Sequence, residues 1–268
     1  MRPCHALFVL LLVGVVSAAE AAEPPALARA RSLYNAADYD GAIAAAVVAQ
    51  RDAPLAEAAA LVLGRAHLER FRLTPDPMDL AAARDALGAL PLAALTPRDQ
   101  VDLLVGLGQS LYLADAFGAA AELFDAALGR GALLGAGDRL MLLDWWATAL
   151  DREAQTRAAD RGASLYARIL DRMAEELRQD PGSGPANYWR AVAARGTGDV
   201  EGAWDAAIAG WVRSTLRPEA SRALRADLDR LVSQALVPER ARARAAPDPA
   251  EALTAMRAEW DAVKRQWK

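Results

Sequence analysis

The chain of 268 residues contains very little cysteine, histidine, asparagine, isoleucine or lysine. It has one Cys, two His, two Asn, three Ile and two Lys. A single cysteine excludes an internal disulfide, because that bond joins two cysteines. The scarcity of isoleucine argues against a large β-sheet, in which β-branched residues are enriched. The net charge of -4 shows no basic excess, so no nucleic-acid partner is expected.

Alanine is the abundant residue, with 66 copies, and 29 of the 31 basic residues are arginine. Alanine has the highest helix propensity of all residues. A hydrophobic content of 54% is too high for a disordered chain. The bias toward Ala and Arg is typical of GC-rich coding, which suggests a bacterial source. Composition therefore predicts a folded helical protein.

Residues 1–21 have the features of a secretory signal peptide. Arg2 supplies the positive charge, residues 6–16 form an unbroken apolar run, and small residues follow at 17–19. The apolar run is shorter than the roughly 20 residues of a transmembrane helix. We expect export to the periplasm, with no transmembrane span after cleavage, and an uncleaved anchor is the alternative. Three alanines are candidate cleavage points: Ala18, Ala19 and Ala21.

Cleavage would remove Cys4 and His5, which leaves no cysteine and one histidine, His67. Thiol catalysis and any Cys or multi-His metal site are then excluded, and no cofactor is expected. His67 has two interpretations, a histidine packed in the core or a general base. No Ser-His-Asp order or nucleophile elbow accompanies it. The sequence therefore does not predict an enzyme, although a carboxylate enzyme acting on the cell wall remains a third hypothesis.

Prolines and capping residues predict where helices begin. Thr96, Pro97 and Asp99 stand in the order of an N-cap, a first-turn proline and an acidic N3 residue. Apolar residues recur with a period of three to four between these signals. We predict about a dozen helices and no strand. Similar starts occur at Asp76-Pro77, Gly184-Pro185, Asp199, Arg217-Pro218 and Asp248-Pro249.

The sequence also predicts a structure for each of three segments that lie outside the regular pattern. Residues 153–179 resemble one long helix. Residues 237–248 are rich in arginine and contain two prolines, which is typical of an exposed connector, with binding to an anionic surface as the alternative. Residues 249–268 form a C-terminal helix that packs on or caps the preceding domain, residues 22–236.

All seven tryptophans follow residue 144, and two interpretations are open for them. Aromatic side chains of this size fill cores, but they are also enriched at binding surfaces. The second interpretation supports a Trp-rich pocket for a small molecule in the region 144–211. Trp267, near the end of the chain, is the one we expect to be most exposed.

Residues 101–134 contain a helical hairpin with a distinctive spacing. Leu104, Leu107, Gly108 and Leu111 share one helix, Asp115 lies at the turn, and Phe117, Ala120, Phe124 and Ala127 follow on the next helix. This pattern resembles the tetratricopeptide repeat, a helix–turn–helix unit of 34 residues. Asp115 stands where the family usually has glycine. Residues 23–56, 57–97 and 184–217 carry the same spacing, the second with an enlarged turn.

The resemblance implies an all-α fold in which antiparallel helix pairs stack into a right-handed superhelix, an α-solenoid with a concave groove. In the family, the first helix of each pair lines the groove and binds peptides or protein segments. Leu27 and Arg31 replace the Lys and Asn of the family's carboxylate clamp, so chaperone tails are not expected ligands. The family positions correspond here to Arg31, Tyr34, Asn35, Arg65, Glu69, Gln109, Tyr112, Tyr188 and Arg195.

The sequence thus leads to an exported binding or scaffold protein that engages a protein or peptide partner through its groove. The main alternative is a periplasmic small-molecule binder that uses the Trp-rich pocket. The sequence does not identify the partner or the oligomeric state.

Overall fold

The computed structural model describes residues 23–243 and 249–268 and contains helices without any β-strand in these residues, which confirms the all-α prediction. The expected signal peptide lies outside the described residues. The α-helices are α1 (Pro25–Asn35), α2 (Tyr39–Ala49), α3 (Ala56–Leu73), α4 (Pro77–Gly88), α5 (Pro97–Tyr112), α6 (Phe117–Leu128), α7 (Ala136–Thr156), α8 (Ala159–Gln179), α9 (Gly184–Gly196), α10 (Val200–Arg213), α11 (Pro218–Leu231), α12 (Val237–Ala243) and α13 (Pro249–Gln266).

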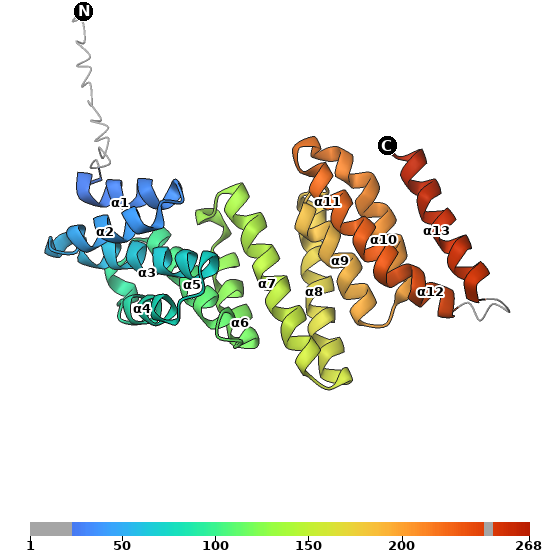
Figure 1. Cartoon of the computed structure of the whole chain (residues 1–268), viewed down its shortest axis with the longest axis horizontal. Coiled ribbons are helices and arrows are strands. Elements are labelled where there is room, and N and C mark those ends of the chain that lie inside the picture. The colour runs from blue at the N-terminus through green and yellow to red at the C-terminus, as the bar shows by residue number, and fades with distance from the viewer. Residues whose placement is uncertain (1–22, 244–248) are drawn as a thin grey trace, which may run out of the picture.

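Consecutive helices pack side by side as pairs, and the pairs follow one another in a row from α1 and α2 to α13 (Figure 1). The pairs are α1 with α2, α3 with α4, α5 with α6, α7 with α8, and α9 with α10. The first helices of successive pairs also touch, α1 with α3, α3 with α5 and α7 with α9, and α9 touches α11 as well. The contacts of α3 with α1 and α5 place side chains of these three helices on a common surface.

Helices begin at the capping residues that the sequence predicted. Thr96 accepts a hydrogen bond from the backbone N–H of Asp99 at the start of α5. Asp76 and Asp199 cap α4 and α10 in the same manner. These bonds satisfy N–H groups that have no partner within the first turn of a helix. Helix α13 begins at Pro249, as expected, whereas the predicted cap lies outside the described residues.

Three of the turns between paired helices have the same backbone geometry. Ala37, Asp115 and Gly198 each have a positive φ, of 59°, 58° and 86°. The next residue in each turn donates its N–H to a carbonyl five positions earlier, at 3.0 Å, as in Asp38 to Leu33. This is the 6→1 bond of the Schellman motif, which ends a helix and reverses the chain. The turns α1–α2, α5–α6 and α9–α10 are therefore structural equivalents.

Two predictions about segment boundaries were wrong. The expected single helix over residues 153–179 is interrupted, because α7 ends at Thr156 and α8 begins at Ala159, with Arg157 extended between them. Residues 237–243 are helix α12 rather than exposed connector, and Arg240 is buried. The remainder of the connector, residues 244–248, lies outside the described residues.

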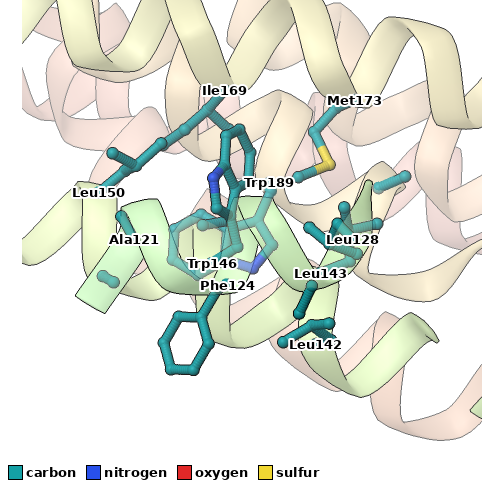
Figure 2. Close-up of a cluster of buried hydrophobic side chains, with 14 of the residues drawn as sticks. Ala121, Phe124, Leu128, Leu142, Leu143, Trp146, Leu150, Ile169, Met173 and Trp189 are labelled. Atoms are coloured by element: carbon teal, nitrogen blue, oxygen red, sulfur yellow. The ribbon is translucent and has the colours of Figure 1, made fainter. Parts of the chain in front are cut away.

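The cores are built from alanine and large side chains in close contact. Ala42, Ala83, Ala120 and Ala203 are completely buried. The central cluster joins α5 to α9, with Trp146 in contact range of side chains from neighbouring helices (Figure 2). Burial of large side chains against small ones brings the helices close together, which favours dense packing.

Helix α13 covers the C-terminal end of the row. Its buried face carries Ala252, Met256 and Trp260. The Trp260 ring makes edge contacts with the rings of Trp204 and Trp211, with centroids 6.0 Å and 5.4 Å apart. The expectation that the C-terminal helix packs on the preceding helices agrees with these contacts.

Candidate functional site

A groove of about 550 Å³ crosses α1, α3 and α5 and reaches the first turns of α7. Six of the nine residues that the sequence singled out line it: Arg31, Tyr34, Asn35, Arg65, Glu69 and Gln109. The helix contacts α1–α3 and α3–α5 bring these residues together, although they are far apart in the sequence. We treat this groove as the candidate functional site.

The other three predicted residues have different surroundings. Tyr112 packs its ring edge-on against Phe117 and Trp145, with centroids 5.2 Å and 5.0 Å apart. Tyr188 and Arg195 lie on α9, away from the lining of this groove. Arg195 forms an ion pair with Glu239 at 2.7 Å. Tyr112 and Arg195 therefore contact residues outside this groove.

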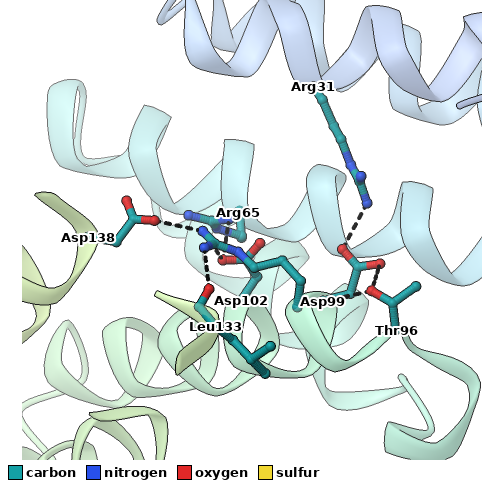
Figure 3. A network of polar contacts seen from close by, with 8 residues as sticks. Arg31, Arg65, Thr96, Asp99, Asp102, Leu133 and Asp138 are labelled. Atoms are coloured by element: carbon teal, nitrogen blue, oxygen red, sulfur yellow. Dashed lines mark hydrogen bonds and ion pairs between the residues drawn. The ribbon is translucent and has the colours of Figure 1, made fainter. Parts of the chain in front are cut away.

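One set of ion pairs joins α1 to α5 at the floor of the groove (Figure 3). Arg31 Nη2 donates to Asp99 Oδ1 at 2.8 Å. Asp99 is buried, and the hydroxyl of Thr96 donates to its second oxygen at 2.9 Å. The cap that starts α5 therefore also fixes the carboxylate that holds α1.

A second set joins α3, α5 and α7 (Figure 3). Arg98 lies 2.8 Å from Asp138 of α7 and also donates to the backbone oxygen of Leu133. Asp102 of α5 is shared between Arg98, at 3.5 Å, and Arg65 of α3, at 3.2 Å. These contacts fix the spacing of the helices that form the groove.

The groove has no excess charge. Its lining contains four arginines, Arg31, Arg65, Arg72 and Arg98, and four carboxylates, Glu69, Asp99, Asp102 and Asp138. Each of these arginines contacts at least one carboxylate of the lining. A ligand with a large net charge therefore gains little from the groove as a whole.

Gln109 differs from its charged neighbours because its side chain has no partner. The residue is 3% exposed and lines the groove, but its amide makes no hydrogen bond to any residue that the structure describes. The amide nitrogen and oxygen are not fully buried, since the fully buried side-chain atoms without a partner in the described residues are Arg65 Nε, Trp146 Nε1 and Trp204 Nε1. The amide retains one acceptor and two donor positions for a ligand.

Tyr34 and Arg65 provide further hydrogen-bonding capacity beside Gln109. The Arg65 guanidinium lies 4.9 Å from the centroid of the Tyr34 ring, and its buried Nε has no partner in the described residues. Burial raises the pKa of the Tyr34 hydroxyl above its usual value of 10.0, which is itself well above neutral pH, so the group is a hydrogen-bond donor. The groove thus combines a phenol, a guanidinium and an amide that can all bind a polar ligand.

Several residues of the groove were not identified from the sequence. Tyr39, Arg72, Arg98, Asp99, Asp102, Asp138 and Met141 also line it. A signal was present for part of this set, because residues 98, 102 and 109 recur at spacings of four and seven along one helix face. The contribution of α7 had no such signal, since it depends on how the pairs stack.

His67 lies outside the lining of the groove, between α3 and α4. Its Nδ1 atom is 2.7 Å from Asp79 Oδ1, and Asp79 also accepts a hydrogen bond from Arg70 Nε at 2.9 Å. Asp79 is 3% exposed. The histidine therefore belongs to a polar contact that joins two helices, in agreement with its packed interpretation.

The tryptophans are mostly in the core. Those with buried side chains are Trp146, Trp189, Trp204, Trp211 and Trp260. Trp267 is 44% exposed, as expected. No tryptophan lines the groove over α1, α3 and α5. The Trp-rich pocket expected in residues 144–211 stays a prediction, because this groove is lined by residues within 31–141.

No family model, curated protein or solved structure matches this chain. Within residues 23–243 and 249–268, no helix is long and apolar enough to cross a membrane. The same residues contain no group of His, Cys, Asp and Glu side chains arranged to hold a metal ion. The groove itself is therefore the basis for a functional proposal.

Proposed function

We propose that this chain is an exported helical-repeat protein of the tetratricopeptide type that binds an extended segment of a partner polypeptide in the groove over α1, α3 and α5. Two polar groups of the lining carry the proposal: the amide of Gln109, which makes no hydrogen bond to a described residue, and the buried Nε of Arg65, which has no partner there. A buried donor without a partner, such as Arg65 Nε, lowers stability by about 1–3 kcal/mol, and a binding role explains why it is retained.

The repeat assignment is supported by the equivalent turns after α1, α5 and α9. Positive φ values at Ala37, Asp115 and Gly198 place the same chain reversal in three helix pairs. Stacked pairs with a common turn favour a superhelix whose first helices face one side. The right-handed superhelix and the relation to the tetratricopeptide family remain parts of this proposal.

The chemistry of the groove favours a peptide main chain as the ligand. Every peptide unit offers one N–H and one C=O, which match the donor and acceptor of an amide such as Gln109. The balance of four arginines and four carboxylates provides no net attraction for a highly charged segment. Recognition of this kind needs no catalytic step, and the proposal includes none.

Peptide selection tests this proposal directly. A display library of random short peptides is selected on the purified protein, and the enriched peptides are measured by calorimetry. Gln109→Leu should weaken their binding at least tenfold, the effect of losing about 1.4 kcal/mol. The control is Gln179→Leu, which alters an exposed glutamine at the end of α8.

Stability measurements separate binding from folding. Since the amide of Gln109 has no partner in the described residues, leucine at this position should leave the melting temperature unchanged or raise it. Peptides that bind Gln109→Leu as tightly as the unmodified chain would contradict the proposal. A selection that enriches no peptide would contradict it as well.

A further inference from the structure

The first helix pair carries a second groove, which is apolar and has a volume of about 590 Å³. All of its lining residues come from α1, α2 and the turn between them: Pro25, Ala26, Arg29, Leu33, Asp38, Gly41, Ala44, Ala45 and Val48. Val48 is 56% exposed despite its apolar side chain. No other described helix contributes to this groove.

The two ends of the row of helices differ in whether another helix covers them. At the C-terminal end, α13 covers the preceding helices with Met256 and Trp260, which are each 2% exposed. At the other end, α1 and α2 are the outermost described helices of the row (Figure 1). The apolar groove that they carry is lined by no other described helix. Terminal units of stacked helical repeats need a polar outer face or a cap for solubility.

The apolar groove carries one basic and one acidic side chain, which can pair between two copies of the chain. Arg29 is exposed and forms no ion pair with any residue that the structure describes, and Asp38 accepts only the hydrogen bond from Gly41 that caps α2. In a symmetric dimer the same surface meets itself, so residue i contacts j and j contacts i. A two-fold axis that runs between Arg29 and Asp38 would bring each arginine toward the aspartate of the other copy.

From these observations we propose that the chain forms a symmetric dimer in which the α1–α2 grooves of two copies cover each other. The apolar run at residues 6–16 of the same chain is a poorer occupant, because it contains no charged residue to pair with Arg29. The proposal is independent of peptide binding in the groove over α1, α3 and α5.

The dimer should be weak. Each helix of the face has 11 residues, which corresponds to a length of about 16 Å. A face formed by two helices of this length buries less area than the roughly 800 Å² per partner of a standard interface. We expect association in the micromolar range rather than a permanent dimer.

Sedimentation velocity over a range of micromolar concentrations tests the proposal with a matched pair of variants. Val48→Asp places a carboxylate in the groove and should raise the dimer dissociation constant at least tenfold. Val47→Asp alters the neighbouring exposed valine, which does not line the groove, and should leave it unchanged. Circular dichroism melts of both variants establish that the fold is retained.

A charge test addresses the orientation of the two copies. Arg29→Glu should weaken the dimer, and adding Asp38→Asn, which keeps a capping side chain, should restore part of the affinity. A chain that stays monomeric at all concentrations overturns the proposal. A dimer that Val48→Asp leaves intact, or that Val47→Asp weakens equally, overturns it too, because the contact would then lie elsewhere.

Discussion

Gly108 of α5 lies directly against the ring of Phe124 on α6. A Cβ atom at Gly108 would be 2.5 Å from Phe124 Cε1, closer than real side chains approach each other. Phe124 is completely buried and is surrounded by the central core. The glycine thus sets the distance between the two helices of this pair.

Substitution at this contact should destabilise the protein. Gly108→Ala forces the Phe124 ring out of its position, and overpacking of this kind costs about 1–3 kcal/mol. Part of that loss is offset by the better helix propensity of alanine. We expect a net loss of about 1–2 kcal/mol in urea unfolding. The control is Gly88→Ala, which meets no atom within 4 Å and should be neutral or stabilising.

A substitution at one of the left-handed turns should stabilise the protein. Ala37 has a φ of 59°, a conformation in which a Cβ atom is strained, whereas glycine adopts it freely. Ala37→Gly should therefore raise the free energy of unfolding by about 1 kcal/mol. Ala36→Gly is the matched control, because Ala36 has a φ of -83° and gains nothing from glycine. Equal effects of the two substitutions would contradict the argument.

Asp79 should contribute to stability in a pH-dependent manner. Hydrogen bonds from Arg70 lower the pKa of this buried carboxyl below its usual value of 3.8. A carboxyl with a lowered pKa in the folded state stabilises the protein above the unfolded pKa, and this contribution is lost as the pH falls through the folded pKa. The stabilisation is therefore present at pH 7 and decreases below about pH 4.

The variant Asp79→Asn measures this contribution. At pH 7 it should lose about 2 kcal/mol, the range for hydrogen bonds to charged groups. In urea unfolding from pH 7 to pH 2, the difference between the two proteins should shrink as the pH falls. A difference that stays constant over this range would show that the charge of Asp79 is not the cause.

Arg240 is expected to be more sensitive to replacement than the other arginines of its segment. It is 7% exposed, donates to Glu201 and Glu259 at 2.8 Å, and its guanidinium lies 4.4 Å from the centroid of the Trp204 ring. Lysine keeps the charge but loses the planar group that stacks and binds two carboxylates. Arg240→Lys should cost about 1–2 kcal/mol.

Hydrogen exchange of α13 provides a second measurement for this variant. Because Glu259 belongs to α13, loss of its contact with Arg240 should speed exchange in that helix. Arg242→Lys is the control, since Arg242 is exposed and donates to the carbonyl of Pro238. Faster exchange in both variants would contradict a specific role for Arg240.

Local sequence signals predicted most of the helix boundaries. Thr96, Asp76 and Asp199 were recognisable as caps because capping is decided within one turn. The break at Arg157 was missed because no proline, glycine or capping side chain marks it. Helix α12 was missed for a different reason. Its arginines suggested solvent, whereas Arg240 is buried by residues distant in sequence.

The groove was predictable where it follows the helix period and not where it depends on stacking. Arg31, Arg65 and Gln109 occupy the same position in successive pairs, so the repeat pattern placed them together. On α9, Arg195 occupies the position that Tyr34 has on α1, but it does not line this groove. The position of α7, which brings Asp138 to the groove, follows from contacts that no local pattern encodes.

The tryptophans and the tyrosines of the groove lie in different parts of the chain, so tryptophan fluorescence reports on one part alone. All seven tryptophans lie between residues 145 and 267, while Tyr34, Tyr39 and Tyr112 belong to the first part of the chain. Tryptophan emission therefore follows the helices from α7 onward, and the groove has only tyrosine among its lining aromatics. Unfolding curves recorded by fluorescence and by far-UV circular dichroism will coincide when both parts melt together, and separate when one part melts first.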